Sequence, residues 1–266
     1  TRYREPDWLV LETIESLAAQ KNVTGEVIFL DQNWTDDFAA TVEQYSTPDL
    51  KFKCVPCEEK GLSYARNYGI KLAEHDHVLF IDSDAIAEPN WAFEMADGLE
   101  RGAAIVGSRI LPKWRGRPPI LARSSVVRDV YSLLDWGTEN IEVTRVVGAG
   151  FGIDISKFSV EMKFSLDFGR RDGKLLSGEE SDLCARVCKA GGEIAYRGKA
   201  LVHHQILPER LHLGWIARRL FYAGMARAQA GGAPNPSGSL GFWDWALLPI
   251  ILPPYAVGYL KQKLAN

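Results

Sequence analysis

Residues 78–85 read Val-Leu-Phe-Ile-Asp-Ser-Asp-Ala, a short apolar run that ends in a pair of acidic residues. The apolar part predicts a buried strand. Because side chains alternate along an extended backbone, Asp82 and Asp84 project to the same side. Two carboxylates in one pocket repel each other unless a cation lies between them, and oxygen ligands suit a hard divalent cation. The stretch therefore predicts a cation site at the end of a strand; an acidic turn that caps the next helix is the alternative.

The chain before this stretch alternates between helical and strand patterns. We expect helices at residues 6–20, 37–45 and 63–73, and strands at residues 26–30 and 50–55. Asp31 stands at the end of the first of these strands. This order predicts an α/β fold, Rossmann-like, with a mostly parallel central sheet flanked by helices. Ligands bind at the carboxyl ends of such strands, which is where Asp31 and the Asp82/Asp84 pair lie.

Two later segments are rich in basic residues. Residues 109–128 contain six Arg or Lys, three Pro and no acidic residue, which predicts a mobile basic loop near the ligand-binding face. Residues 209–230 have a helical pattern with four Arg, and a Gly/Pro/Ser-rich linker at residues 231–241 follows. We expect a boundary near residue 206, between a domain at residues 1–206 and a helical, apolar extension at residues 207–266.

The composition excludes several classes of protein. Hydrophobic residues make up 46% and charged residues 24% of the 266 residues, which is the balance of a globular protein rather than a disordered one. The formal net charge is −3, so no nucleic-acid partner is expected. No secretory leader pattern is visible, so we expect a cytoplasmic protein.

The four cysteines are too few for a disulfide framework in a chain of this length. Cys54 and Cys57 have zinc-site spacing, and Cys184 and Cys188 would share one helical face, so a four-thiolate zinc site is an alternative. Neither pair has the turn glycines of a zinc knuckle, which favours reduced thiols.

Several motifs follow one another in a recognisable order. They are Thr1-Arg-Tyr3, Asn33-Trp-Thr-Asp36 after the strand end at Asp31, residues 61–67, 80–85, 147–151 and 177–183, and Val202-His-His204. Together they resemble glycosyltransferase family 2 over about residues 1–206. The resemblance implies a GT-A fold with a nucleotide-binding half at about residues 1–110 and an acceptor half at about residues 111–206. It also implies an inverting transfer of a sugar from a nucleotide-diphosphate donor, in polysaccharide, glycolipid or other cell-envelope glycan synthesis.

The resemblance implies roles for individual residues. Those that match nucleotide-binding positions are Thr1, Tyr3, Asp31, Arg66 and Asp82, and those that match the sugar and acceptor pocket are Gly148, Ala149, Gly150 and Asp182. Asp84 matches the direct metal ligand, with Asp82 in the metal shell. Glu180 matches the catalytic base; because the family usually has Asp there, Glu179 stays a competing candidate. The family's first strand would lie before Thr1, so we expect native residues to precede Thr1.

Glycosyl transfer needs a cation that neutralises the departing diphosphate and a carboxylate that takes the proton of the acceptor hydroxyl. We expect Mn²⁺ or Mg²⁺ as the cofactor. His203 and His204 follow a short strand, and one of them, with His203 preferred, would complete the metal shell, since imidazole suits Mn²⁺ better than Mg²⁺. The expected partners are a UDP-sugar first, a GDP- or dTDP-sugar next, and a glycan or lipid-linked acceptor.

Three other activities are alternatives. A phosphatase of the haloacid-dehalogenase type would use Asp82 as its nucleophile, but it leaves residues 61–67 unexplained. A nucleotidyltransferase would release pyrophosphate instead of a nucleoside diphosphate. A protein that binds sugar nucleotides without turnover is the third, and the presence of Asp84, Glu179 and Glu180 argues against it.

The C-terminal extension combines basic and apolar character. Residues 207–266 hold six basic and two acidic residues, and the uncharged run at residues 245–260 contains Pro249, Pro253 and Pro254. That run is shorter than the about 20 residues of a spanning helix, and we expect the prolines to interrupt it. We predict that the extension lies on the inner face of an anionic membrane. Packing on the core or a homodimer interface is the alternative.

Overall fold

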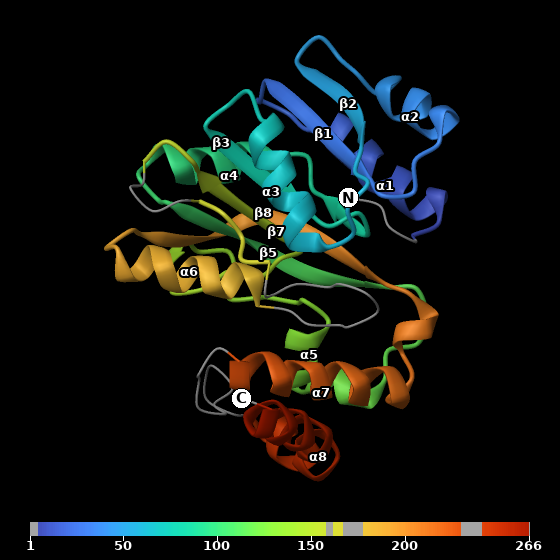
Figure 1. Ribbon diagram of the computed structural model, residues 1–266, viewed down its shortest axis with the longest axis vertical. Coiled ribbons are helices and arrows are strands. Elements are labelled where there is room, and N and C mark those ends of the chain that lie inside the picture. The colour runs from blue at the N-terminus through green and yellow to red at the C-terminus, as the bar shows by residue number, and fades with distance from the viewer. Residues whose placement is uncertain (1–4, 158–161, 167–177, 230–240, 266) are drawn as a thin grey trace.

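The computed structural model describes residues 5–157, 162–166, 178–229 and 241–265, and its strands form two sheets (Figure 1). In the smaller sheet, β1 (Gly25–Asp31) pairs in parallel with β2 (Leu50–Pro56). Two helices, α1 (Asp7–Ala18) and α2 (Asp36–Glu43), contribute apolar side chains to one hydrophobic cluster with these strands. This part of the chain has the helices and strands that the sequence patterns predict, within two residues at their ends.

The larger sheet has the strand order β3-β7-β5-β8-β4, with β6 paired to β8 outside this path. Its strands are β3 (His77–Ile81), β4 (Ala85–Ala87), β5 (Ile105–Trp114), β6 (Ile141–Glu142), β7 (Gly150–Asp154) and β8 (Ile194–Ile206). Among these described strands, β5 and β8 run parallel and every other pair is antiparallel. The α/β class with a central sheet flanked by helices is confirmed, but the mostly parallel order is wrong for this sheet. The helix–strand pattern that suggested it covers residues 6–81, and β7 and β8, which come later in the chain, bring the antiparallel neighbours.

Helices lie on both faces of the larger sheet. Neighbouring residues of β5 point to opposite faces: Val106 packs in a cluster with α4 (Trp91–Glu100), and Ile105 packs in another with α6 (Glu179–Lys189). The remaining helix of the first half, α3 (Leu62–Leu72), lies against β1. This arrangement directs the beginnings of α3 and α6 to the region where β3 ends (Figure 1).

The segment expected to be a mobile basic loop is regular structure instead. It contains most of β5, a 3₁₀ turn η1 (Ile120–Arg123) and α5 (Ser125–Val130). Three of its six basic side chains have acidic partners elsewhere in the chain: Arg109 Nε lies 2.8 Å from Asp135 Oδ1, and Lys113 and Arg115 contact Glu12. These partners lie outside the segment, so a charge count within the segment does not show them.

The C-terminal part contains a 3₁₀ turn, η2 (Pro208–Arg210), and two helices, α7 (Leu213–Gln229) and α8 (Phe242–Ala265), that pack side by side (Figure 1). Ile216 of α7 and Leu247 of α8 belong to the same hydrophobic cluster as Val106 of β5. These helices thus share a core with the larger sheet, and the boundary near residue 206 stays a prediction.

The helix α8 is continuous although it contains three prolines, so the expectation that they interrupt it is wrong. A proline removes the hydrogen bond to the carbonyl four residues earlier. Those carbonyls belong to the exposed residues Trp245, Pro249 and Ile250, where water can replace the lost bonds. Within the described part of the chain, no helix combines the length and the apolar character needed to cross a bilayer.

Candidate active site

Asp82 and Asp84 lie just beyond the end of β3, next to His204 of β8. One side-chain ligand atom from each of the three residues lies within 4.8 Å of the other two. They meet because Ala85, the residue after Asp84, is paired with His204 in the register of β4 and β8. Among the residues that the structure describes, this is the only such group of three or more His, Cys, Asp or Glu side chains. The four-cysteine alternative therefore has no counterpart in the described chain.

The orientation of His204 fits metal binding. Its Nδ1 lies 2.6 Å from the carbonyl oxygen of Tyr131, which can only accept, so Nδ1 carries the hydrogen and Nε2 is left facing Asp84 Oδ1 at 3.2 Å. A hydrogen bond of this kind, from the ring nitrogen that does not face the metal, usually fixes a metal-binding imidazole. His203 points elsewhere and bonds Glu88 Oε1 at 2.9 Å. The preference for His203 is thus wrong: alternate residues of β8 face opposite ways, and only His204 faces the acidic pair.

Two carboxylates and one imidazole form a donor set that suits a divalent cation, and Mn²⁺ accepts the nitrogen more readily than Mg²⁺ does. Asp84 and His204 are nearly fully buried, and Asp82 is partly exposed. The residues present therefore fit a cation that keeps an open side toward solvent.

Arg66 connects the acidic pair to the beginning of α6. Its guanidinium lies 2.8 Å from Glu179 Oε1 and 3.5 Å from Asp82 Oδ1, and it donates to the carbonyl of Gly148 at 3.1 Å. The same group lies over the rings of Phe151 and Phe164. A buried arginine with these partners holds three separate segments of the chain in fixed positions.

Residues 148–150 form the turn that the sequence predicts beside the sugar and acceptor. Ala149 accepts a hydrogen bond from the backbone N–H of Asp82 at 3.3 Å, and Gly150 is paired with Ile81 in the register of β3 and β7. A Cβ on Gly148 would lie 3.0 Å from Arg66 Nη2 and 3.4 Å from Glu180 Oε1. Glycine is therefore the residue that lets this turn pass between the two charged groups.

Glu179 and Glu180 begin α6 and have different surroundings. Glu179 is buried and paired with Arg66. Burial and, next, the charge of Glu179 raise the pKa of Glu180 to about 7. Its buried Oε2 has no hydrogen-bond partner within the described chain. A carboxyl with a pKa near neutrality can exchange a proton with a substrate at ordinary pH.

Two residues of this region were not identified from the sequence. Arg210, expected only as part of a basic helix, places Nη2 at 2.8 Å from Asp84 Oδ2. Tyr131 holds His204 through its carbonyl oxygen and donates its hydroxyl hydrogen to the carbonyl of Arg210 at 2.9 Å. Neither belongs to a local motif, so no pattern in the sequence could have singled them out.

The other expected site residues are placed as follows. Asp31 is buried at the end of β1, where Oδ1 accepts from the N–H of Asn33 at 2.8 Å. Asp182 lies in the first turn of α6 and pairs with Arg186 at 3.0 Å. Thr1 and Tyr3 lie outside the described residues. The binding roles of these four residues stay predictions.

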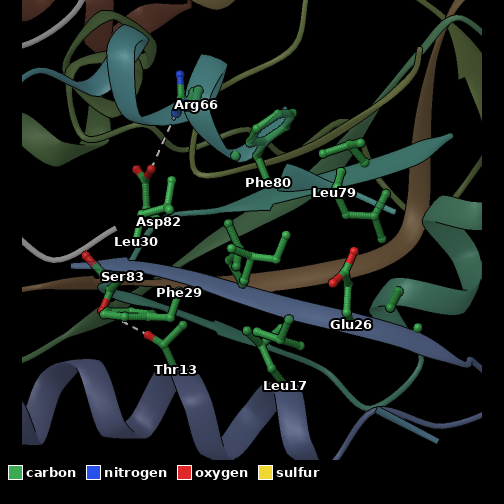
Figure 2. Close-up of a pocket in the computed structure, with 18 of the residues that line it drawn as sticks. Thr13, Leu17, Glu26, Phe29, Leu30, Arg66, Leu79, Phe80, Asp82 and Ser83 are labelled. Atoms are coloured by element: carbon green, nitrogen blue, oxygen red, sulfur yellow. Dashed lines mark hydrogen bonds and ion pairs between the residues drawn. The ribbon is translucent and has the colours of Figure 1, made fainter. Parts of the chain in front are cut away.

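A cavity of about 1070 Å³ lies between β1 and β3 (Figure 2). Its walls carry apolar side chains such as Phe29 and Leu79 together with polar and charged ones such as Glu26, and Asp82 and Arg66 stand at one end. Within the described chain, β1 pairs only with β2 and β3 only with β7. A gap between two unpaired strand edges suits an added strand, whereas a charged ligand suits the end that carries Asp82 and Arg66. We therefore place the chemistry at the acidic end of the cavity.

Comparison with known proteins gives a family and a fold. The family model described as "Glycosyl transferase family 2" matches residues 3–159. The chain is 26% identical over 224 residues to the glucosyl-dolichyl phosphate glucuronosyltransferase of Haloferax volcanii, covering 81% of this chain and 70% of that protein. It is 29% identical over 209 residues to the pre-mycofactocin glycosyltransferase of Mycobacterium tuberculosis, covering 78% of this chain but only 42% of that protein.

Among solved structures, the chain is similar to a mannosyltransferase of Pyrobaculum calidifontis crystallised with GDP-Man and Mn²⁺. The TM-score is 0.57 at 18% identity, and the match covers 100% of this chain and 74% of that one. This likeness concerns the fold, which agrees with the GT-A fold expected from the sequence motifs.

Proposed function

The chain belongs to glycosyl transferase family 2, and we propose that it transfers a sugar from a nucleoside-diphosphate donor to a hydroxyl acceptor by a single, inverting displacement. The observation that carries the proposal is a carboxyl with a pKa near 7, Glu180, next to Glu179, whose ion pair with Arg66 leads to the Asp82–Asp84–His204 group. Such a displacement needs a base for the acceptor and positive charge for the leaving group in one place.

In this reaction the carboxylate of Glu180 takes the proton of the acceptor hydroxyl while that oxygen forms a bond to the anomeric carbon. The bond between the anomeric carbon and the diphosphate oxygen breaks, and its electron pair leaves with the nucleoside diphosphate. When bound, a divalent cation held by Asp82, Asp84 and His204 would offset the charge of that leaving group. Glu179 keeps Arg66 in place and is not the base, since its carboxylate is already engaged in a buried ion pair.

We assign the nucleotide to Thr1, Tyr3, Asp31, Arg66 and Asp82, and the sugar and acceptor to the side of Gly148, Ala149, Gly150 and Asp182. A UDP-sugar is the first candidate donor, and GDP- and dTDP-sugars follow. The dolichyl phosphate in the name of the Haloferax relative supports a lipid-linked acceptor. The proposed activity is that of a hexosyl-type transferase in cell-envelope glycan synthesis.

The test is a panel of UDP-, GDP- and dTDP-sugars with Mn²⁺ or Mg²⁺, in which released nucleoside diphosphate and pyrophosphate are measured separately. Release of nucleoside diphosphate that falls at least a hundredfold in Glu180→Gln supports the proposal. Release of pyrophosphate indicates a nucleotidyltransferase. Binding of a donor without turnover, in the presence of a panel of acceptors, indicates a binding protein. Either of the last two results overturns the proposal.

We also propose that α8 rests on an anionic membrane surface. Its exposed apolar residues are Phe242, Trp245, Ile250, Leu252, Val257, Leu260 and Leu264. At about 100° per residue they fall within one arc of roughly 160°, opposite the buried Leu247 and Ile251. The arc holds no charged residue from Phe242 to Leu260, and lysines 261 and 263 follow it. An apolar helical face bordered by basic residues is typical of helices that lie in the lipid interface.

Sedimentation with vesicles tests this placement. Wild type should bind vesicles that contain phosphatidylglycerol and not those of phosphatidylcholine alone, and Trp245→Glu with Val257→Glu should abolish binding. Ile120→Glu, a matched change at an exposed apolar residue outside α8, should leave it intact. If wild type binds neither kind of vesicle but is a dimer, and the double variant is a monomer, then a second copy of the chain covers this face.

A further inference from the structure

Arg210 lies against the acidic pair, in a place that no sequence motif assigns to it. The Nη2–Oδ2 distance to Asp84 is 2.8 Å, and the side chains are 15% and 8% exposed. Arg210 is the last residue of η2, the turn that follows β8, and β8 is the strand that carries His204. Arg210 therefore approaches Asp84 from the same segment as the imidazole.

The position of Arg210 is built into the fold. Tyr131 is 1% exposed and forms hydrogen bonds with both residues that contact Asp84. Its hydroxyl donates to the carbonyl of Arg210, and its carbonyl oxygen accepts from Nδ1 of His204. Its ring stacks on Trp215 at 5.2 Å and meets Trp114 edge-on at 5.5 Å. An arginine fixed in this way differs from an exposed ion pair, whose partners exchange freely with water.

Each carboxylate of the acidic pair has a guanidinium beside it. Asp82 lies 3.5 Å from Arg66, which also pairs with Glu179, and Asp84 lies 2.8 Å from Arg210. A divalent cation that binds Asp84 alone must compete with Arg210 for the same carboxylate. A diphosphate that arrives with the cation brings oxygens with which the displaced guanidinium can pair, and arginine suits phosphate geometry well.

We propose that Arg210 is the counter-ion of Asp84 in the empty protein and binds the diphosphate of the donor when a cation takes Asp84. This rests on the proposed function, since it needs a nucleoside-diphosphate donor. Arg210 then opposes the binding of the cation alone and favours the binding of cation and diphosphate together. It couples the two ligands, and the coupling is reciprocal.

The experiment measures two affinities that should change in opposite directions when Arg210 is replaced. The first is that of Mn²⁺ alone, followed by the electron paramagnetic resonance of free Mn²⁺. The second is that of UDP and of GDP at saturating Mn²⁺, followed by calorimetry, with UMP and GMP for comparison. In Arg210→Met, the affinity for Mn²⁺ alone should rise several-fold, and that for the diphosphate should fall about tenfold to a hundredfold. The monophosphates should change little, and Arg210→Lys should recover part of the diphosphate affinity.

Arg101→Met is the control, because Arg101 is an exposed arginine paired within its own helix, and it should change neither affinity. If both affinities fall together in Arg210→Met, or if neither moves, Arg210 is a structural residue and the inference is overturned. If Arg210→Met does not fold, the same two affinities are measured in Arg210→Lys. A wild type that binds neither diphosphate and releases none from any sugar donor contradicts the proposed function instead, so the two failures are distinguishable.

Discussion

The change Glu180→Gln should inactivate the protein and stabilise it at the same time. Gln keeps the shape of the side chain but can neither take a proton from the acceptor nor carry a negative charge. Loss of a general base typically lowers the rate by about a hundredfold to ten-thousandfold. A residue that serves only the fold would not give both effects.

The size of the stabilisation follows from the surroundings of Glu180. Burial and the charge of Glu179 raise its pKa to about 7, from an ordinary 4.5. One pKa unit corresponds to about 1.4 kcal/mol, so holding this carboxylate ionised in the folded state costs up to about 3 kcal/mol. Because the folded state binds the proton more tightly than the unfolded state, wild-type stability falls as pH rises from about 4.5 to 7. The variant lacks this fall.

The assay is denaturant unfolding of both proteins at pH 4.5 and at pH 8.5. The two free energies of unfolding should nearly coincide at the lower pH, and the variant should exceed wild type by up to about 3 kcal/mol at the higher pH. In wild type, kcat/KM should rise with pH along a limb with an apparent pKa of about 7, since the base must be ionised.

Glu179→Gln is the matched control at the adjacent residue. It removes the charge that faces buried Arg66, so it should destabilise the protein by about 3 kcal/mol or more at both pH values. A Glu180→Gln variant that keeps its activity, or whose stability relative to wild type does not depend on pH, would refute the assignment of Glu180 as the base.

Two further outcomes are expected. His204→Gln should weaken Mn²⁺ binding at least tenfold, whereas His203→Gln should leave it within about twofold of wild type; calorimetry with the metal alone decides, and equal losses would contradict the orientation argument. Gly148→Ala should lower activity and destabilise the fold by about 1–3 kcal/mol, because its Cβ crowds Arg66 and Glu180; Gly214→Ala, where a Cβ meets nothing within 4 Å, should be neutral in the same unfolding and turnover assays.

Local patterns predicted the elements of the first half well. Apolar periodicity located α1, β1, α2, β2, α3 and β3 because each buries one face or one stripe, and that requirement is written in neighbouring residues. The same reasoning failed for residues 109–128. Arg109, Lys113 and Arg115 pair with Asp135 and Glu12, which lie outside the segment, so the local charge count suggested a loop where the chain forms a central strand.

The sequence alone determined the acidic pair after β3, the order of motifs that identifies the family, and the two glutamates at the start of α6. Only the tertiary structure decided which histidine meets Asp84, which glutamate has the raised pKa, and that Arg210 belongs to the site. The physical reason is that each of these depends on short distances between distant parts of the chain. Arg66 lies 2.8 Å from Glu179 across 113 residues of sequence, and electrostatic interactions depend on that separation in space and on burial, neither of which a local motif contains.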